Sequence, residues 1–260
     1  MQKSDKLGLF EGLIKLSLTP TVISKKLKET YLGNLENVLE AVSTDCVIFG
    51  FEDKKLKILL VNRLLESMRG TWALPGGFIL KDENLGEAPL RILKDMANLT
   101  DVYLEQIAAF GEVNRFPHAR TVTVGYYALV NPSQFELCSF KSEALEARWF
   151  NLSDKPSLPY DHNLIAEAAL DKLKLKLRHE PIGFELLPDK FSLRQLQDLY
   201  EAIIGVDLDN RNFRKKILKM DVLRKLNEKQ NGVKHRQAVL YQFDAEKYKK
   251  LPDQAAFFTI

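Results

Sequence analysis

Hydrophobic and polar positions follow two different periods along the chain, and the change of period marks the predicted secondary structure. Short runs of β-branched and aromatic residues, CVIFGF and KILLV, flank a polar turn at 52–55 and predict a β-hairpin. Similar runs at 121–130 and 147–152 predict two further strands. Over 85–99, in contrast, apolar residues recur every three or four positions, which predicts a helix between the hairpin and the later strands.

The segments on either side complete a first domain. Residues 1–40 have amphipathic helical spacing with a break at Pro20, and we assign them no chemistry. A lysine-rich helical pattern over 165–177 closes the region, and HEPIG at 179–183 predicts a linker. This mixture of strands and helices predicts an α+β domain built on a mixed sheet over 41–178, preceded by an N-terminal helical extension over 1–40.

The C-terminal region has its own order of elements. Ser192 followed by Gln195 forms a capping box, and it begins a helix with an apolar face that ends at Gly205. Asp209 or Asn210 can cap a second helix, which is basic and is followed by two β-like runs joined by a charged tip. A helix, a tight turn, a basic helix and a hairpin are the elements of a winged helix-turn-helix, which we place at 184–255.

Positive charge is concentrated in this region, although the whole chain carries only +3. Between residues 211 and 236 there are ten bases and two acids, a density that contact with DNA phosphates would require. The second helix would enter the major groove and the tip would hold flanking phosphates. A solvated charged face and a helical appendage for dimerisation are the alternatives. The predicted DNA-binding residues are Arg211, Asn212, Arg214, Lys215, Lys219, Lys234 and Arg236.

Composition narrows the class of protein. The 260 residues are 45% hydrophobic and 28% charged, which excludes collagen-like, disordered and membrane-spanning chains. Cys46 and Cys138 are too few for a disulfide framework or a thiolate zinc site, which favours a reducing compartment. The apolar stretch at 7–18 is interrupted by Glu11 and Lys15 and is too short to span a bilayer. We therefore expect a cytoplasmic protein with no signal peptide and no membrane contact.

One motif carries candidate chemistry. In WALPGGFILKDENLGEAPLRILKDMANL, five residues separate Gly77 from Glu83 and seven separate Glu83 from Arg91. This spacing resembles the Nudix box, the signature of hydrolases that act on nucleoside diphosphates linked to another group. Members of that family gather carboxylates on the box helix around Mg²⁺, which bridges pyrophosphate oxygens and activates water. The resemblance implies an α/β/α Nudix sandwich with a mixed sheet.

The carboxylates that would bind the metal are largely missing. The corresponding positions are Ile92, Asp95 and Met96, so two of the three side chains are apolar. Ile92 and Met96 also belong to a continuous apolar stripe. We therefore expect a catalytically inactive domain with no metal, no cofactor and no catalytic residue. The other members of the stripe are Leu85, Ala88 and Leu99.

The charges that remain on this helix have a structural explanation. Glu87, Arg91 and Asp95 are spaced i, i+4 and i+8, which predicts a ladder of surface ion pairs. Pro89 falls in the early turns, where we expect it to distort the helix. Asn98 stands where the family has glycine.

The resemblance covers roughly residues 43–245. RFPHARTVTVGYYALV is similar to the RDPRGR-plus-strand segment of ADP-ribose-handling Nudix proteins, with Phe116 for aspartate and His118 for arginine. LPYDHNLIAEAALDKLK, FSLRQLQDLYEAIIGVDLDNRNFRKKIL and LYQF resemble segments of the Nudix-related transcriptional regulators. Members of that group sense ADP-ribose or a pentose-type sugar with a degenerate Nudix domain and hold operator DNA as a homodimer. The resemblance implies a repressor whose partners are double-stranded operator DNA and such a small-molecule effector.

The predicted effector site combines aromatic and basic side chains. Phe116 is suited to stacking on a sugar face, which favours a sugar, whereas Arg115 and Arg120 could pair with phosphate. Ordinary core packing is the alternative for each aromatic residue, and Asp161 and His162 could simply cap the closing helix. The candidates are Trp72, Phe78, Arg115, Phe116, Arg120 and His162.

Two other functions fit parts of the sequence. An active pyrophosphohydrolase would hold its metal with Glu83, Asp95 and residues that the sequence does not identify. A scaffold would bind neither DNA nor nucleotide. Release of AMP from ADP-ribose distinguishes the first of these from a regulator, and a DNA gel shift distinguishes the second.

Overall fold

The computed structural model describes residues 41–63, 70–137, 144–230 and 237–250. The expected helical extension at 1–40 therefore lies outside the described residues. Within the described chain, no helix is long and apolar enough to cross a membrane.

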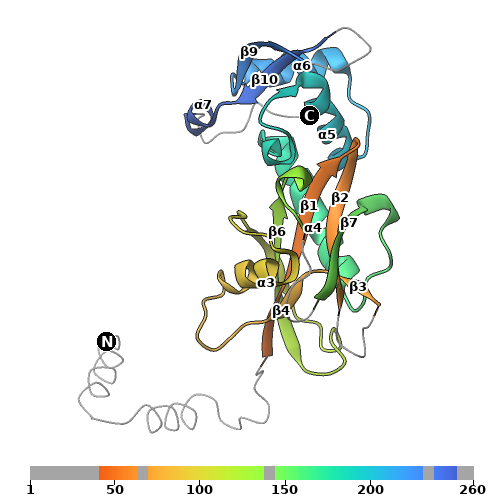
Figure 1. Cartoon of the computed structure of the whole chain (residues 1–260). Helices are drawn as coiled ribbons and strands as arrows, with labels where there is room; N and C mark the ends of the chain where they lie inside the picture. The colour runs from red at the N-terminus through yellow and green to blue at the C-terminus, as the bar shows by residue number, and fades with distance from the viewer. Residues whose placement is uncertain (1–40, 64–69, 138–143, 231–236, 251–260) are drawn as a thin grey trace, which may run out of the picture. The chain divides into compact units, whose positions relative to one another are not determined.

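A mixed sheet of seven described strands forms the first part of the fold (Figure 1). Its order is β3-β2-β1-β6-β5, with β4 paired to β1 and β7 paired to β2. β1 and β6 run parallel and the other pairs run antiparallel, so the mixed sheet is confirmed. The strands are β1 (Ala41–Glu52), β2 (Lys55–Arg63), β3 (Trp72–Ala73), β4 (Gly76–Phe78), β5 (Glu105–Phe110), β6 (Thr121–Leu129) and β7 (Ala144–Asn151).

The alternation of side chains along β1 explains why the sheet is covered on both faces. Val47 and Phe49 pack into the core that contains α4 (His162–His179), whereas Cys46 and Ile48 pack against α3 (Ala88–Ala97). Successive residues of a strand point to opposite faces, so a continuous apolar run needs a hydrophobic layer on each side. The expected α/β/α sandwich is confirmed.

α3 is shorter than the predicted helix over 85–99. It begins at Ala88, so Pro89 lies in the first turn, where its missing N–H costs no intrahelical hydrogen bond. The expected distortion by Pro89 was therefore wrong. Leu85 lies before the helix and is 42% exposed, which removes it from the buried stripe. Asn98 ends the helix in the left-handed conformation, with φ of 55°, where the family has glycine.

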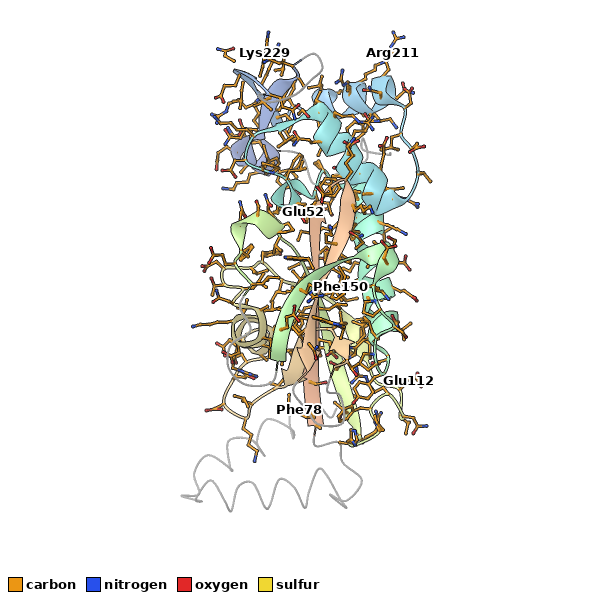
Figure 2. The ribbon with its side chains drawn as sticks, turned by 45° about the vertical axis from the view of Figure 1, so that its right-hand side comes forward. Glu52, Phe78, Glu112, Phe150, Arg211 and Lys229 are labelled. Atoms are coloured by element: carbon orange, nitrogen blue, oxygen red, sulfur yellow. The ribbon has the colours of Figure 1, made fainter. Side chains whose placement is uncertain are left out.

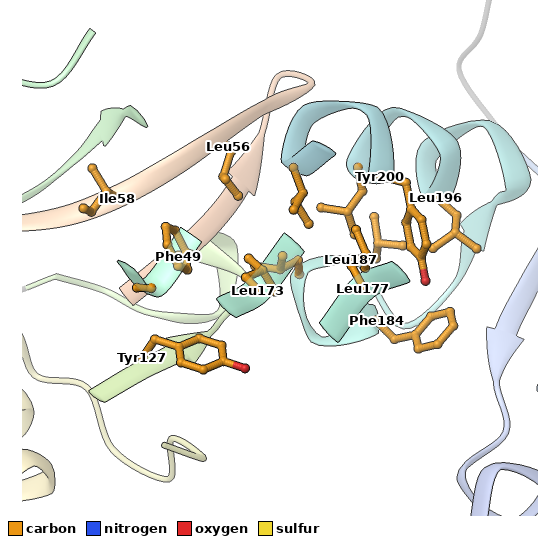
Figure 3. Packing of buried hydrophobic residues seen from close by; sticks show 14 of the residues in the cluster. Phe49, Leu56, Ile58, Tyr127, Leu173, Leu177, Phe184, Leu187, Leu196 and Tyr200 are labelled. Carbon is orange, nitrogen blue, oxygen red and sulfur yellow. The ribbon is translucent and has the colours of Figure 1, made fainter. Parts of the chain in front are cut away.

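α4 is longer than predicted and its core continues into the C-terminal region. Leu173 and Leu177 of α4 belong to the same buried cluster as Leu196 and Tyr200 of α5 (Leu193–Ile204) (Figure 3). The segment at 179–183, expected as a linker, is partly buried, and the Tyr200 hydroxyl donates to the Ile182 carbonyl at 3.2 Å. This connection is therefore part of the packed core.

The C-terminal elements have the predicted order. The Ser192 hydroxyl accepts from the Gln195 N–H, and the Gln195 side chain accepts from the Ser192 N–H, which confirms the capping box of α5. Gly205 ends α5 with φ of 82°. An antiparallel sheet of order β8-β10-β9 completes the winged helix-turn-helix. The remaining elements are β8 (Phe191–Ser192), α6 (Asn210–Lys219), β9 (Leu223–Lys229), β10 (Val239–Phe243) and α7 (Ala245–Lys249).

Candidate functional site

A buried ionic cluster lies where β1, the loop before β6 and the start of α4 meet. The Arg115 guanidinium donates to both carboxylate oxygens of Asp161, at 2.8 and 2.7 Å, and to Oδ2 of Asp45 at 3.3 Å. Arg115 and Asp45 are both buried. The two acids thus hold Arg115 in a fixed position through Nε and Nη2 and balance its charge, which leaves little of that charge for an external phosphate.

The backbone around Asp45 is shaped to admit this carboxylate. The Thr123 hydroxyl on β6 donates to Asp45 Oδ2 at 2.8 Å. Gly76 on β4 pairs with Asp45, and a Cβ atom at Gly76 would lie only 2.1 Å from Asp45 Oδ1. A side chain at position 76 would therefore displace the carboxylate, so glycine is required there.

His162 adds a ring to the edge of the cluster. Its Nδ1 accepts the backbone N–H of Leu74 at 3.1 Å, and its Nε2 lies 3.6 Å from Asp45 Oδ1. Because Nδ1 accepts, the proton of the neutral ring is on Nε2 and faces Asp45. Asp161 is the first residue before α4, but its side chain makes no capping bond, since it binds Arg115. The capping role considered for Asp161 was therefore wrong.

Aromatic side chains gather beside this ionic cluster. The Phe116 ring makes edge-to-face contacts with Tyr160, at 5.1 Å between centroids, and with Phe78 at 6.4 Å. Tyr160 in turn contacts His162 at 5.9 Å. Phe78 is 50% exposed, and Figure 2 places it at the end of β4. We call Phe78, Phe116 and Tyr160 the aromatic cluster.

The structure separates two predicted effector residues from this group. Trp72 packs against Phe150 at 4.8 Å between centroids and lies under the Arg148 guanidinium. The Arg120 guanidinium donates to the backbone carbonyls of Gly111, Glu112 and Thr121. Of the six candidates, Phe78, Arg115, Phe116 and His162 thus come together.

On α3, the helix of the Nudix-like box, apolar side chains occupy the positions at which that family binds metal. Ile92 and Met96 are buried and form one hydrophobic cluster with Val61. Among the described residues, no group of three or more His, Cys, Asp or Glu side chains could hold a metal ion. The side chains present do not fit Mg²⁺, which requires several oxygen ligands.

Glu83 and Arg91, the two charged residues that define the box spacing, form an ion pair. Arg91 Nε and Nη2 donate to the two carboxylate oxygens of Glu83, at 2.8 and 2.7 Å, and Nη2 also donates to the Phe78 carbonyl. The hydrogen bonds from Arg91 lower the pKa of Glu83 to about 2. Glu87 accepts from the Asn84 N–H. Arg91 thus reaches the loop that precedes the helix, and the expected ladder of Glu87, Arg91 and Asp95 stays a prediction.

α6 presents the candidate nucleic-acid interface. The Asp209 carboxylate caps the helix by accepting from the Asn212 N–H at 2.8 Å, and Phe213 and Ile217 fix the buried face. Figure 2 shows Arg211 pointing away from the ribbon. Lys234 and Arg236, predicted on the tip, lie outside the described residues. The exposed candidates on α6 are Arg211, Asn212, Arg214, Lys215 and Lys219.

Sequence reasoning missed two members of the site. Asp45 directly precedes the apolar run that begins at Cys46, and nothing in its neighbours indicates that a distant arginine neutralises it. Tyr160 adopts a left-handed conformation with φ of 53°, which is uncommon for a bulky residue. No sequence signal for either was available within their own segments, because both depend on contacts with residues far along the chain.

Comparison with known proteins identifies both parts of this fold. The model of the NUDIX domain matches residues 39–172, and the model of the NrtR DNA-binding winged helix domain matches residues 183–243. The chain belongs to the NrtR-type family of Nudix-related transcriptional regulators. As an NrtR-type protein, it is 33% identical over 211 residues to the ADPR responsive transcriptional repressor NtrR of Acinetobacter baylyi, covering 80% of this chain and 83% of the relative.

Two solved structures resemble this NrtR-type chain. Shewanella oneidensis NrtR complexed with a 27mer DNA matches with a TM-score of 0.67 and 28% identity, covering 80% of this chain and 95% of that one. The NUDIX domain of the same protein complexed with ADP ribose matches with a TM-score of 0.50 and 29% identity, covering 60% of this chain and 99% of that one.

Proposed function

We propose that this protein is a transcriptional repressor that binds operator DNA through α6 and releases it when an ADP-ribose-type effector binds the Nudix domain. The observation that carries the proposal is the exposed row of bases on α6 within a winged helix-turn-helix. Family membership supports it, because the A. baylyi relative is an ADPR responsive repressor and S. oneidensis NrtR has been crystallised with DNA.

The DNA interface would use two kinds of contact. Arg211, Asn212, Arg214, Lys215 and Lys219 on α6 would face base edges and phosphates of the major groove. Lys234 and Arg236 would hold flanking phosphates from the tip between β9 and β10. A homodimer would place two such helices on a near-palindromic operator, about 34 Å apart. The proposed DNA-binding domain is 184–255, and it would work in the cytoplasm.

The effector would bind at the aromatic cluster of the proposed sensing domain, 41–178. Phe78 and Phe116 offer partly exposed ring surfaces for stacking. Arg115, with Nε and Nη2 held by Asp45 and Asp161, would position Asp161 and the start of α4 rather than bind phosphate directly. The co-crystal of the S. oneidensis NUDIX domain with ADP ribose favours ADP-ribose over a pentose-type sugar as the ligand.

We further propose that the domain binds the effector without cleaving it. Hydrolysis in the Nudix family needs a metal held by carboxylates of the box helix, and Ile92 and Met96 here form a hydrophobic seam. Glu83, the remaining box glutamate, has its two oxygens bound by Arg91. Binding would then be free to shift the balance between a DNA-competent and a DNA-incompetent state, provided the effector binds the two states with different affinity.

Binding to DNA tests the interface. The probe is a fluorescent duplex that the full-length wild-type protein selects from a random library. Lys215→Ala should weaken binding about tenfold and make the log-log salt dependence shallower by about one, as expected for a lost phosphate contact. Lys94→Ala is the matched control, because Lys94 is an exposed lysine on α3. Equal effects of the two variants, or no effect of Lys215→Ala, would contradict the assignment of α6.

Titration of the protein–DNA complex tests the effector. ADP-ribose should release the labelled duplex and raise the thermal midpoint of the free protein, because a ligand of the folded state stabilises it by mass action. Ribose and arabinose are the comparison ligands, and release by them alone would favour a pentose regulator. AMP formation is followed in the same samples with Mg²⁺ or Mn²⁺. Turnover on the order of 1 s⁻¹, within the usual range of enzymes, would replace the sensor by a hydrolase.

A further inference from the structure

One cavity of the described structure is lined by residues outside both the aromatic cluster and α6. It has a volume of about 430 Å³ and is lined by residues that follow α3 and β6 on one side and by residues of 184–191 and β10 on the other. Small-molecule sites in proteins commonly have volumes of 300–1,000 Å³. The cavity is therefore large enough for a small organic ligand.

One wall of this cavity is aromatic. The Phe184 ring stacks on Phe243 with 4.3 Å between centroids and an interplanar angle of 19°, and on Phe191 at 5.9 Å and 29°. Val130 and Leu187, both buried, add apolar surface to the lining. Phe184 and Phe191 are buried, so the ring surface open to a ligand comes from Phe243, Phe135 and the exposed Tyr103, which also line the cavity. Such rings favour a ligand with a flat ring, because a ring buries much apolar area without losing conformational freedom.

The charged groups of the lining have a single sign. Asp101, Glu185 and Asp189 are exposed acids, and among the described residues no lysine, arginine or histidine lines the cavity. Bases beside the lining are already engaged, since Lys190 pairs with Glu228 at 2.7 Å and Arg224 donates to the side chain of the lining residue Gln242. The local field therefore attracts a cation and repels phosphate.

We propose that this cavity is a binding site for a flat aromatic cation. The aromatic wall would hold the ring, and Asp101, Glu185 and Asp189 would balance the positive charge at the mouth. This chemistry is opposite to that of a nucleoside diphosphate, so the site would not be a second place for the proposed effector. The inference also stands apart from the proposed function, because none of its residues belongs to the aromatic cluster or to the proposed DNA contacts.

Three probes of the same shape and different charge test the site. Benzamidine is a cation, benzamide is neutral and benzoate is an anion, and each is titrated into the full-length protein by ligand-observed NMR. Benzamidine should bind at least about tenfold more tightly than benzoate, with benzamide between them, because the charged residues of the described lining are three acids. Equal affinities, or no binding of benzamidine, would overturn the proposal.

A pair of substitutions locates the binding. Asp101→Asn with Asp189→Asn removes two of the three charges, and asparagine suits the left-handed conformation of Asp101, whose φ is 57°. The double variant should weaken benzamidine binding about tenfold and leave benzamide binding unchanged, because the apolar wall remains. Asp95→Asn with Asp171→Asn carries the same charge change elsewhere and should leave both affinities unchanged.

Two control measurements distinguish loss of the charged groups from unfolding of the protein. Benzamide binding and the thermal midpoint report whether the double variant keeps the cavity, independently of its charge. Weakening of benzamidine to the same degree by Asp95→Asn with Asp171→Asn would show general attraction to an acidic surface and would overturn the proposal. Retained wild-type affinity for benzamidine in Asp101→Asn with Asp189→Asn would overturn it as well.

Discussion

The box helix α3 and the helix α6 each contain ten residues and use their side chains in opposite ways. Six residues of α3 are buried, and Arg91, a charged residue of the box motif, is bound to Glu83. Only Phe213 and Ile217 of α6 are buried, and its bases are exposed to solvent. On α3, Arg91 is thus bound within the fold while Lys94 is exposed, whereas Arg211, Arg214, Lys215 and Lys219 of α6 are all exposed to solvent.

This difference explains how two helices of equal length can have different roles in the same protein. A helix that carries apolar residues in place of carboxylates contributes to the stability of its domain. A helix with a narrow apolar face and exposed bases contributes little to the core and offers a surface to phosphates. Variants of the two helices should therefore change different measurable properties.

The largest expected effect is on the stability of the box helix. Ile92 is buried beside Val61 and Met96, so Ile92→Ala should lower the free energy of unfolding by about 2–5 kcal/mol through lost burial and a cavity. Chemical denaturation measures the change. Ile92→Val removes only one methylene and should cost about 0.5–1.5 kcal/mol.

The matched variant of α6 tests the contrast directly. Lys215→Ala should stay within about 0.5 kcal/mol of wild type in the same denaturation experiment, because Lys215 is exposed. If Lys215→Ala destabilised the protein as much as Ile92→Ala does, the bases of α6 would be structural and the comparison would fail.

The next effect concerns how α6 begins. Asp209→Ala removes the carboxylate that accepts the Asn212 N–H and should lower the free energy of unfolding by about 1 kcal/mol. Asp209→Asn keeps an acceptor and should restore most of this loss. Thermal denaturation of the two variants side by side measures the cap, and equal stability of both would show that the capping bond does not contribute.

The smallest effect is the pH dependence of the Glu83–Arg91 ion pair. The pKa of Glu83 is lowered from 4.5 to about 2, so the pair stabilises the folded state above about pH 4.5 and this contribution is lost as the pH falls towards 2. The coupling between the two residues is measured by denaturing wild type, Glu83→Gln, Arg91→Gln and the double variant at several pH values. A coupling that stayed constant from pH 7 to pH 3 would contradict the assigned pair.

Much of the fold followed from local pattern. Runs of β-branched and aromatic residues predicted β1, β2, β6 and β7, and Ser192 with Gln195 marked the start of α5. Short elements such as β3, β4 and β8 were not predicted, because two or three residues carry no periodic signal. The sequence pattern predicted a helix start at residue 85, which makes Pro89 an interior residue. The helix instead begins at Ala88, because proline suits the first turn.

The candidate site followed from the sequence only in part. Phe78, Arg115, Phe116 and His162 were predicted and lie together, whereas Trp72 and Arg120 have other contacts. The partners of the charged residues were the hardest to predict from the sequence. Spacing on one helix predicted that Arg91 pairs with Glu87 and Asp95. In the fold, Glu83 reaches Arg91 from the loop before the helix with better hydrogen-bond geometry.

By itself, the sequence determined the strand and helix periods, the caps of α5 and α6, the basic character of α6 and the replacement of two box carboxylates by Ile92 and Met96. These are properties of neighbouring residues, which geometry within a strand or helix turns directly into structure. Only the tertiary structure decided that Asp45 and Asp161 share Arg115, and that phenylalanines of the C-terminal region face acids around a cavity. Asp45 and Asp161 lie 70 and 46 positions from Arg115, and the cavity brings Asp101 to the same lining as Phe184 and Phe243. No local pattern encodes which distant side chain will neutralise a buried charge.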